Sequence, residues 1–122
     1  MTKLNKVGFF QELPHGDTDG PILKDLIRKE ANKQQNEIIQ YLVSGVELIT
    51  CLGVTSDILD PSSDVIISPN IITDGTWAWP LDLSYYVKAY NIELPKEFTK
   101  HIENNNWEIP IITDEILFTL EI

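Results

Sequence analysis

The sequence is nearly free of cysteine and has no long apolar run. Its single cysteine, Cys51, cannot form an internal disulfide, and an unpaired thiol favours a reducing cytosol over a secreted setting. No window approaches the roughly 20 uninterrupted apolar residues that cross a bilayer, and residues 1–10 lack the apolar core of a signal peptide. We therefore expect a cytoplasmic protein with no membrane partner.

Lysine and arginine are missing from the middle of the chain. Residues 34–87 contain seven Asp or Glu residues and no lysine or arginine, and most of the net charge of −10 arises there. Such a stretch repels phosphate, so nucleic acid is not an expected partner, whereas a basic protein would be attracted. Acidic residues also keep a cytosolic protein in solution, and that interpretation explains the charge equally well.

Common catalytic signatures are absent too. The sequence has no phosphate-binding glycine loop, dinucleotide fingerprint, G-x-S-x-G motif or C-x-x-C pair. One imidazole and three carboxylates, on Glu12, His15, Asp17 and Asp19, lie close enough in sequence to ligate a divalent metal. The calcium-loop pattern fails, and Pro-His-Gly-Asp is also a good turn sequence. We therefore expect no cofactor and keep this metal site as an alternative.

What is present is the composition of one globular domain spanning residues 1–122. Hydrophobic residues make up 43% and charged residues 23%, which excludes wholesale disorder. The predicted elements are a strand at 6–13, helices at 21–31 and 34–44, a largely buried strand at 46–52, a short strand at 65–67, a hairpin at 70–79 and helices at 81–90 and 95–105. Residues 115–122 are predicted to be a strand or a short helix, with a strand favoured. This order does not alternate as βαβ units do. It predicts an α+β fold with a small, mostly antiparallel sheet covered by about four helices.

The clearest local signal is the hairpin. The two-residue connection Asp74-Gly75 is typical of a tight turn between two strands. In that register Ile72 faces Trp77, and Trp79 shares the same face. We expect this face to be buried.

Four sequence blocks together resemble a known group of small bacterial proteins. The blocks are Phe9-Phe10-Gln11-Glu12-Leu13-Pro14-His15-Gly16, Asp19-Gly20-Pro21, Thr73-Asp74-Gly75-Thr76-Trp77-Ala78-Trp79-Pro80-Leu81-Asp82-Leu83-Ser84-Tyr85-Tyr86-Val87 and Leu94-Pro95-Lys96-Glu97-Phe98. The group shares the pattern DG-x-W-x-W-P-x-DL-x-YYV, is mostly uncharacterised, and includes members similar to immunity proteins of toxin systems. The resemblance covers about residues 9–107 and implies no catalytic residues.

These observations predict a solvent-facing acidic surface that binds a basic protein. Tyr85 is expected on the outward face of its helix, because an exposed aromatic among carboxylates suits a cationic partner. The predicted contact residues are Asp57, Asp60, Asp64, Asp74, Asp82 and Tyr85. The predicted function is a non-enzymatic, immunity-type inhibitor that occludes a basic toxin domain, such as a nuclease.

Two alternative functions stay open at this point. One is a small metal-assisted hydrolase that uses the residues of the 12–19 loop. The other is a homo-oligomer, such as a homodimer, in which residues 115–122 add as a strand to a neighbouring chain.

Overall fold

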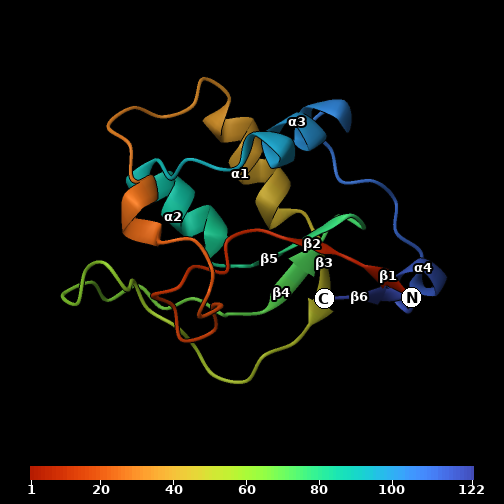
Figure 1. The fold of residues 1–122 in the computed structure, drawn as a ribbon, viewed down its shortest axis with the longest axis horizontal. Helices are drawn as coiled ribbons and strands as arrows, with labels where there is room; N and C mark the ends of the chain where they lie inside the picture. The colour runs from red at the N-terminus through yellow and green to blue at the C-terminus, as the bar shows by residue number, and fades with distance from the viewer.

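The computed structural model, which describes residues 1–122, has a four-stranded sheet with three helices grouped on one side of it (Figure 1). The elements are β1 (Thr2–Lys3), β2 (Asn5–Lys6), a 3-10 turn (Leu23–Leu26), α1 (Gln35–Val43), β3 (Val46–Ile49), β4 (Ile71–Thr73), β5 (Trp77–Pro80), α2 (Leu83–Tyr90), α3 (Lys96–Asn104), α4 (Asp114–Leu117) and β6 (Leu120–Glu121). The main sheet has the order β2-β5-β4-β3, and only its β2–β5 pairing is parallel. The predicted α+β class is confirmed.

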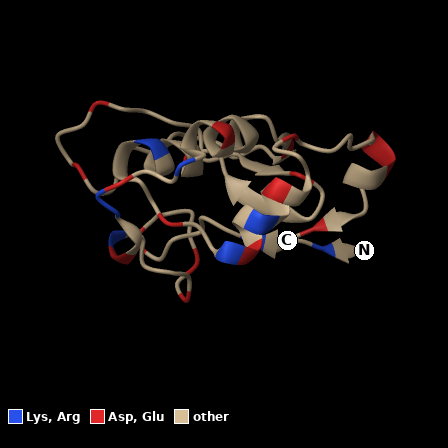
Figure 2. Cartoon of the chain, turned by 90° about the horizontal axis from the view of Figure 1, so that it is seen from above, with Lys and Arg blue, Asp and Glu red and all other residues tan.

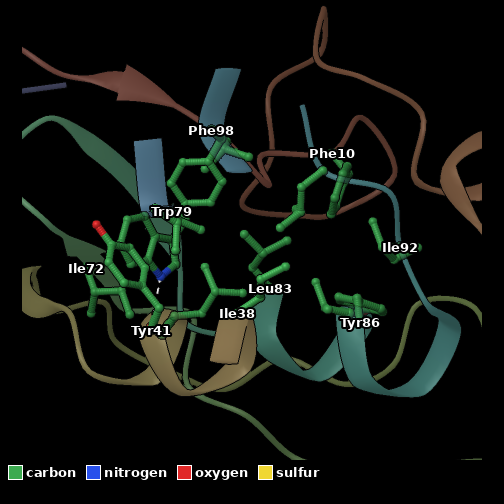
Figure 3. Packing of buried hydrophobic residues seen from close by; sticks show 14 of the residues in the cluster. Phe10, Ile38, Tyr41, Ile72, Trp79, Leu83, Tyr86, Ile92 and Phe98 are labelled. Atoms are coloured by element: carbon green, nitrogen blue, oxygen red, sulfur yellow. Dashed lines mark hydrogen bonds between the residues drawn. The ribbon is translucent and has the colours of Figure 1, made fainter. Parts of the chain in front are cut away.

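Trp79 joins the sheet to the helices. It is fully buried on β5, and its ring packs against Tyr41 of α1 at a centroid distance of 6.0 Å and against Phe98 of α3 at 5.5 Å. Its indole N–H donates to the carbonyl of Leu42 at 3.0 Å. Figure 3 shows the three aromatic rings together at one end of the core, with Ile72 beside them. One large side chain therefore fixes β5 against two helices.

Helix α2 buries a single apolar stripe. Leu83, Tyr86 and Val87 are buried on one face, and the helix ends at Asn91, which is in the left-handed conformation with φ 53°. Asparagine tolerates this conformation better than most residues, so it is a natural helix end. No helix is long and apolar enough to cross a lipid bilayer.

The helix predicted at 21–31 is reduced to a single 3-10 turn. The Glu12 carboxylate accepts hydrogen bonds from the backbone N–H groups of Leu23 and Lys24, at 2.8 and 3.0 Å. Beyond the turn the chain becomes extended, and the Arg28 N–H donates to the carbonyl of Tyr90. Contacts with distant residues therefore replace the bonds that a longer helix would have made.

The hairpin forms, but its predicted register is wrong. Ile72 lies opposite Trp79 rather than Trp77. The Asp74 carboxylate accepts hydrogen bonds from the N–H groups of Thr76 and Trp77, at 2.9 and 2.7 Å, and this local turn lengthens the connection. The shift is two residues, so the buried face is kept: Trp79 is fully buried, whereas Trp77 is half-buried.

The C-terminal segment is only partly a strand. The single turn α4 precedes β6, and β6 pairs in parallel with β1 of the same chain, with Leu120 opposite Thr2. Leu120 also packs in a small second apolar cluster with Leu4 and Ala78. One edge of this strand thus pairs within the chain, and the alternative in which residues 115–122 add to a neighbouring chain stays a prediction.

Candidate protein-binding surface

The long connection between β3 and β4, residues 50–70, is held together by its own hydrogen bonds. The Cys51 N–H donates to the Asn70 side chain at 2.8 Å, at the base of the connection. Further out, the backbones of Thr55 and Ile67 exchange two hydrogen bonds, of 2.7 and 2.9 Å. A connection longer than about 12–15 residues is unusual in a compact domain and is commonly functional. We call residues 50–70 the β3–β4 loop.

Asp57 attaches this loop to α2. The residue is only 4% exposed. One carboxylate oxygen accepts the hydroxyls of Tyr85 and Tyr90, at 2.7 and 2.5 Å, and the other accepts the N–H groups of Leu59 and Asp60, at 2.8 and 3.2 Å. The carboxylate therefore organises a turn within the loop and binds two side chains of the helix at the same time.

The hydrogen bonds keep Asp57 charged. Burial by itself raises the pKa of its carboxyl. The hydrogen bonds from Tyr90, Tyr85 and the two backbone N–H groups lower the pKa by more than burial raises it, so the pKa lies below its ordinary value of 3.8. The same contact acts in the opposite direction on its partners. The hydrogen bond to Asp57, followed by burial, raises the pKa of both Tyr90 and Tyr85.

Tyr86 is a second attachment point between the loop and α2. The side chain is buried in the core, and its hydroxyl accepts the Ile58 N–H at 3.0 Å and donates to the Ser56 carbonyl at 3.3 Å. Burial raises the pKa of Tyr86 to about 12. Three tyrosines of one helix thus bind the middle of the β3–β4 loop.

The anchored loop exposes large aliphatic side chains. Leu52, Val54, Ile58 and Ile66 are 40% to 98% exposed. Val54 and Ile66 each flank a residue of the antiparallel Thr55–Ile67 bridge, so they lie diagonally across it on one face. An exposed apolar face on an ordered loop, here formed by Val54 and Ile66, marks a candidate surface for binding another protein.

Three of the predicted contact carboxylates are not on the surface. Asp57, Asp74 and Asp82 are 4%, 2% and 1% exposed, which corrects the prediction that they face solvent together. Asp60 and Asp64 are exposed, and both lie in the β3–β4 loop.

Tyr85 also departs from its predicted environment. It is half-buried rather than outward-facing, its hydroxyl is bound to Asp57, and its ring contacts Tyr86 edge-on at 5.3 Å. Its role in the structure is to hold the loop.

Asp74 joins the hairpin turn to α1 and α3. It accepts the hydroxyl of Tyr41, and it lies 2.9 Å from the Nε2 atom of His101. Asn105 completes the cluster by donating to the Tyr41 hydroxyl at 3.0 Å. Burial, together with the hydrogen bond to Asp74, raises the pKa of Tyr41. This carboxylate is enclosed by its partners and cannot reach another protein.

Asp82 lies at the start of α2 and faces His15. The His15 Nε2 and Asp82 Oδ2 atoms are 2.8 Å apart, a close polar contact whose geometry is not that of a hydrogen bond. Because the carboxylate is buried, this contact links the 12–19 loop to α2 inside the fold.

The four side chains of the alternative metal site have separate partners. Glu12 accepts backbone N–H groups of the 3-10 turn, His15 contacts Asp82, and Asp17 pairs with Lys6 at 2.7 Å. Asp19 is exposed. No three His, Cys, Asp or Glu side chains of the chain lie where they could hold a metal ion. The structure therefore contradicts the metal site, and the hydrolase alternative loses its basis.

The carboxylates as a whole do not gather on one side of the molecule. Figure 2 shows Asp and Glu residues dispersed over loops, helices and strand ends around the chain. The acidic character of the candidate surface is thus local: it comes from Asp60 and Asp64, in a stretch of the chain that has no lysine or arginine.

Sequence reasoning missed the exposed aliphatic residues. Hydrophobic identity assigned Leu52 to a buried strand and Ile66 to a short strand, yet Leu52 is 98% exposed. Turn-forming residues near Leu52 and Ile66 could have indicated an exposed loop instead: Gly53 follows Leu52, and Pro61-Ser62-Ser63 lies between the two residues.

Comparisons of the chain with protein-family models, with curated proteins and with solved structures give no match. The resemblance carried by the hairpin and α2 sequence block stays a prediction.

Proposed function

We propose that the chain is a non-enzymatic protein-binding module that presents its β3–β4 loop to a basic protein. The observation that carries the proposal is the anchored loop itself. Buried Asp57 and Tyr86 fix its course, while Val54 and Ile66 extend into solvent on one face. Aliphatic side chains on a rigid support provide the apolar centre of an interface.

The charge of the loop favours a cationic partner. Asp60 and Asp64 are exposed in the same loop as the aliphatic residues, and no lysine or arginine occurs between residues 34 and 87. Exposed charges at the rim of an interface mainly raise the association rate and select the partner, whereas the apolar centre supplies most of the affinity. The partner should therefore have an apolar recess surrounded by lysine or arginine.

At a finer level, we propose an immunity-type inhibitor that covers the working surface of a basic toxin domain. The resemblance of the 73–87 block to proteins of this kind supports it, and so does the net charge of −10. The mechanism would be steric occlusion, with charge complementarity bringing the two proteins together.

Affinity capture from the native host tests this proposal. The tagged wild-type chain should retain a basic protein whose yield falls as salt is raised. The double variant Val54→Ser/Ile66→Ser should lose it, whereas Ile111→Ser should not. Ile111 is a suitable control because it is 91% exposed and outside the β3–β4 loop.

Charge reversal separates the two parts of the interface. Asp60→Lys/Asp64→Lys should slow association about 10-fold or more at low salt, and the matched variant Glu108→Lys/Glu115→Lys should change it little. Capture of only acidic proteins, or equal retention by the Val54/Ile66 and Ile111 variants, would disprove the proposal.

A further inference from the structure

The outer edge of β3 has no partner within the chain. β3 is the last strand in the order β2-β5-β4-β3, so β4 covers only one of its two edges. Outside the ladder with β4, no backbone–backbone hydrogen bond involves residues Val46–Ile49. The N–H and C=O groups on the other edge are therefore free, and such an edge accepts an extended segment as a further strand.

The sequence of β3 does not block this edge. Proteins commonly keep a free sheet edge from pairing by placing lysine or proline on it, and Val46–Ile49 contains neither. The opposite end of the sheet differs, because β2 carries the exposed Lys6, and the adjoining β1 carries the exposed Lys3 and pairs with β6. Of the two ends, the β3 edge is the one open to a basic partner.

Side chains of two kinds flank the free edge. The ladder with β4 is irregular here, and Glu47 lies opposite Ile72. Ile49 lies opposite the preceding residue, Ile71, so Glu47 and Ile49 point to opposite faces of the sheet. Both residues are exposed, Ile49 by 42%. A strand added at this edge thus meets a carboxylate on one face and an aliphatic side chain on the other.

Glu47 gives the edge a negative charge that no cation of the chain neutralises. Its carboxylate accepts a hydrogen bond from the Asn70 side-chain amide but forms no salt bridge. A residue directly opposite on an added strand has its Cβ about 4.5–5.5 Å away, so a lysine or arginine there reaches the carboxylate. β3 also leads directly into the β3–β4 loop, so this edge is continuous with the proposed protein-binding surface.

We propose that the edge of β3 binds an extended segment of the partner protein as an added β-strand, and that lysine or arginine alternates with aliphatic residues in this segment. The inference rests on the proposed function, because it names how the basic partner of the β3–β4 loop engages the chain. Backbone hydrogen bonds hold the segment. A cation opposite Glu47 and an aliphatic side chain beside Ile49 select its sequence.

The experiment uses the capped hexapeptide Val-Lys-Val-Lys-Val-Lys as the probe and follows the backbone amide signals of the labelled chain by NMR titration. Saturable shifts are expected at Val46–Ile49. The acidic peptide Val-Glu-Val-Glu-Val-Glu should bind at least about 3-fold more weakly. The lysine peptide N-methylated at two consecutive residues loses a donor on each of its edges. It should bind about 5-fold more weakly or worse, because the added strand loses a backbone hydrogen bond.

A charge variant tests the role of Glu47. Glu47→Lys should weaken the lysine peptide about 3–10-fold and favour the acidic one, because attraction at an exposed site becomes repulsion. The matched control is Glu37→Lys, which makes the same change of charge at an exposed position of α1. It should leave both affinities unchanged. The three-peptide comparison on the wild-type chain decides the question even if the Glu47 variant fails to fold.

Three results would overturn the strand addition. They are the absence of saturable β3 shifts at millimolar peptide, equal binding of the N-methylated peptide, and β3 signals that shift on dilution of the free chain, which would show pairing with a second copy. The proposed function fails separately, when the Val54→Ser/Ile66→Ser and Ile111→Ser variants capture the basic protein equally. If the Val54/Ile66 variant loses capture while the peptides give no β3 shifts, the loop surface stands and the added strand does not.

Discussion

Replacing Asp57 with asparagine tests whether one buried carboxylate holds the β3–β4 loop on α2. The Asp57→Asn change keeps an oxygen for the N–H groups of Leu59 and Asp60. It exchanges the other oxygen, which accepts the hydroxyls of Tyr85 and Tyr90, for an NH₂ group. The side chain stays the same size, so the effect reports on charge and hydrogen bonding alone.

The magnitude follows from the two tyrosine contacts. A hydrogen bond to a charged group contributes roughly 1.5–3 kcal/mol. Tyr85 and Tyr90 are half-buried, so their hydroxyls can turn to water or to the new amide and recover part of that. We expect Asp57→Asn to lower the free energy of unfolding by about 2–3 kcal/mol.

Urea unfolding followed by tryptophan fluorescence measures this loss, and hydrogen exchange locates it. Exchange should accelerate first at the amides of Ile58, Leu59 and Asp60. The matched control is Asp60→Asn, which changes the net charge equally but removes an exposed carboxylate that accepts bonds only from Ser62. The control should cost about 0.5 kcal/mol or less. If the two variants are equally stable, Asp57 does not anchor the loop.

The comparison of wild type with Asp57→Asn also predicts a pH dependence. Because the pKa of Asp57 is lower in the folded chain than its ordinary value of 3.8, its stabilisation is complete above that value and disappears as the pH falls through the folded pKa. The stability difference between wild type and Asp57→Asn should thus be constant from pH 7 to about pH 5 and shrink below about pH 4. A difference that grows on acidification would contradict this assignment.

Three further outcomes are expected. His15→Gln should lower the free energy of unfolding by about 1–3 kcal/mol. Adding Asp82→Asn to this variant should restore part of the lost stability, because both side chains of the pair are then neutral. Thermal unfolding of the single and double variants checks this. Gly53→Ala should cost about 1 kcal/mol from its positive φ alone, whereas Gly16→Ala should prevent native folding, judged by circular dichroism, because the added carbon would lie 1.8 Å from a backbone carbonyl oxygen. The pKa values of the bound tyrosines are raised, to about 12 for Tyr86, so the stability that their hydroxyl contacts contribute is present below the ordinary value of 10.0 and is lost at higher pH. Phenolate absorbance should therefore rise together with unfolding as the pH is raised. A separate rise in absorbance at lower pH than unfolding would contradict these contacts.

Local patterns predicted three of the four helices and the presence of the hairpin, because periodicity and turn chemistry act over a few residues. The stripe of α2 and its end at Asn91 were readable in this way. The register of the hairpin was not, because Asp74 bonds two backbone N–H groups and lengthens the turn. The 21–31 segment failed for a non-local reason: the Arg28 N–H donates to the Tyr90 carbonyl and the Leu26 carbonyl accepts the Glu93 N–H, so these groups are not free to continue a helix.

The candidate site depended even more on distant contacts. Counting carboxylates located the acidic stretch, but it could not show which carboxylates are buried. Asp60 faces solvent, whereas Asp57 is enclosed by tyrosines roughly thirty residues away in sequence. Asp74 and Asp82 likewise find histidines that lie far from them along the chain. Hydrophobic identity also predicted burial for side chains that the loop instead exposes.

The internal bonds of the β3–β4 loop have a consequence for the thermodynamics of association. Fixing a disordered backbone costs roughly 1–2 kcal/mol of conformational entropy per residue. Here that cost is met during folding, by the Thr55–Ile67 bridge and the tyrosine contacts of Asp57. A partner would meet a preorganised shape, so a few aliphatic side chains could give useful affinity. The heat capacity change on binding should then reflect only the apolar area covered, without a contribution from coupled folding.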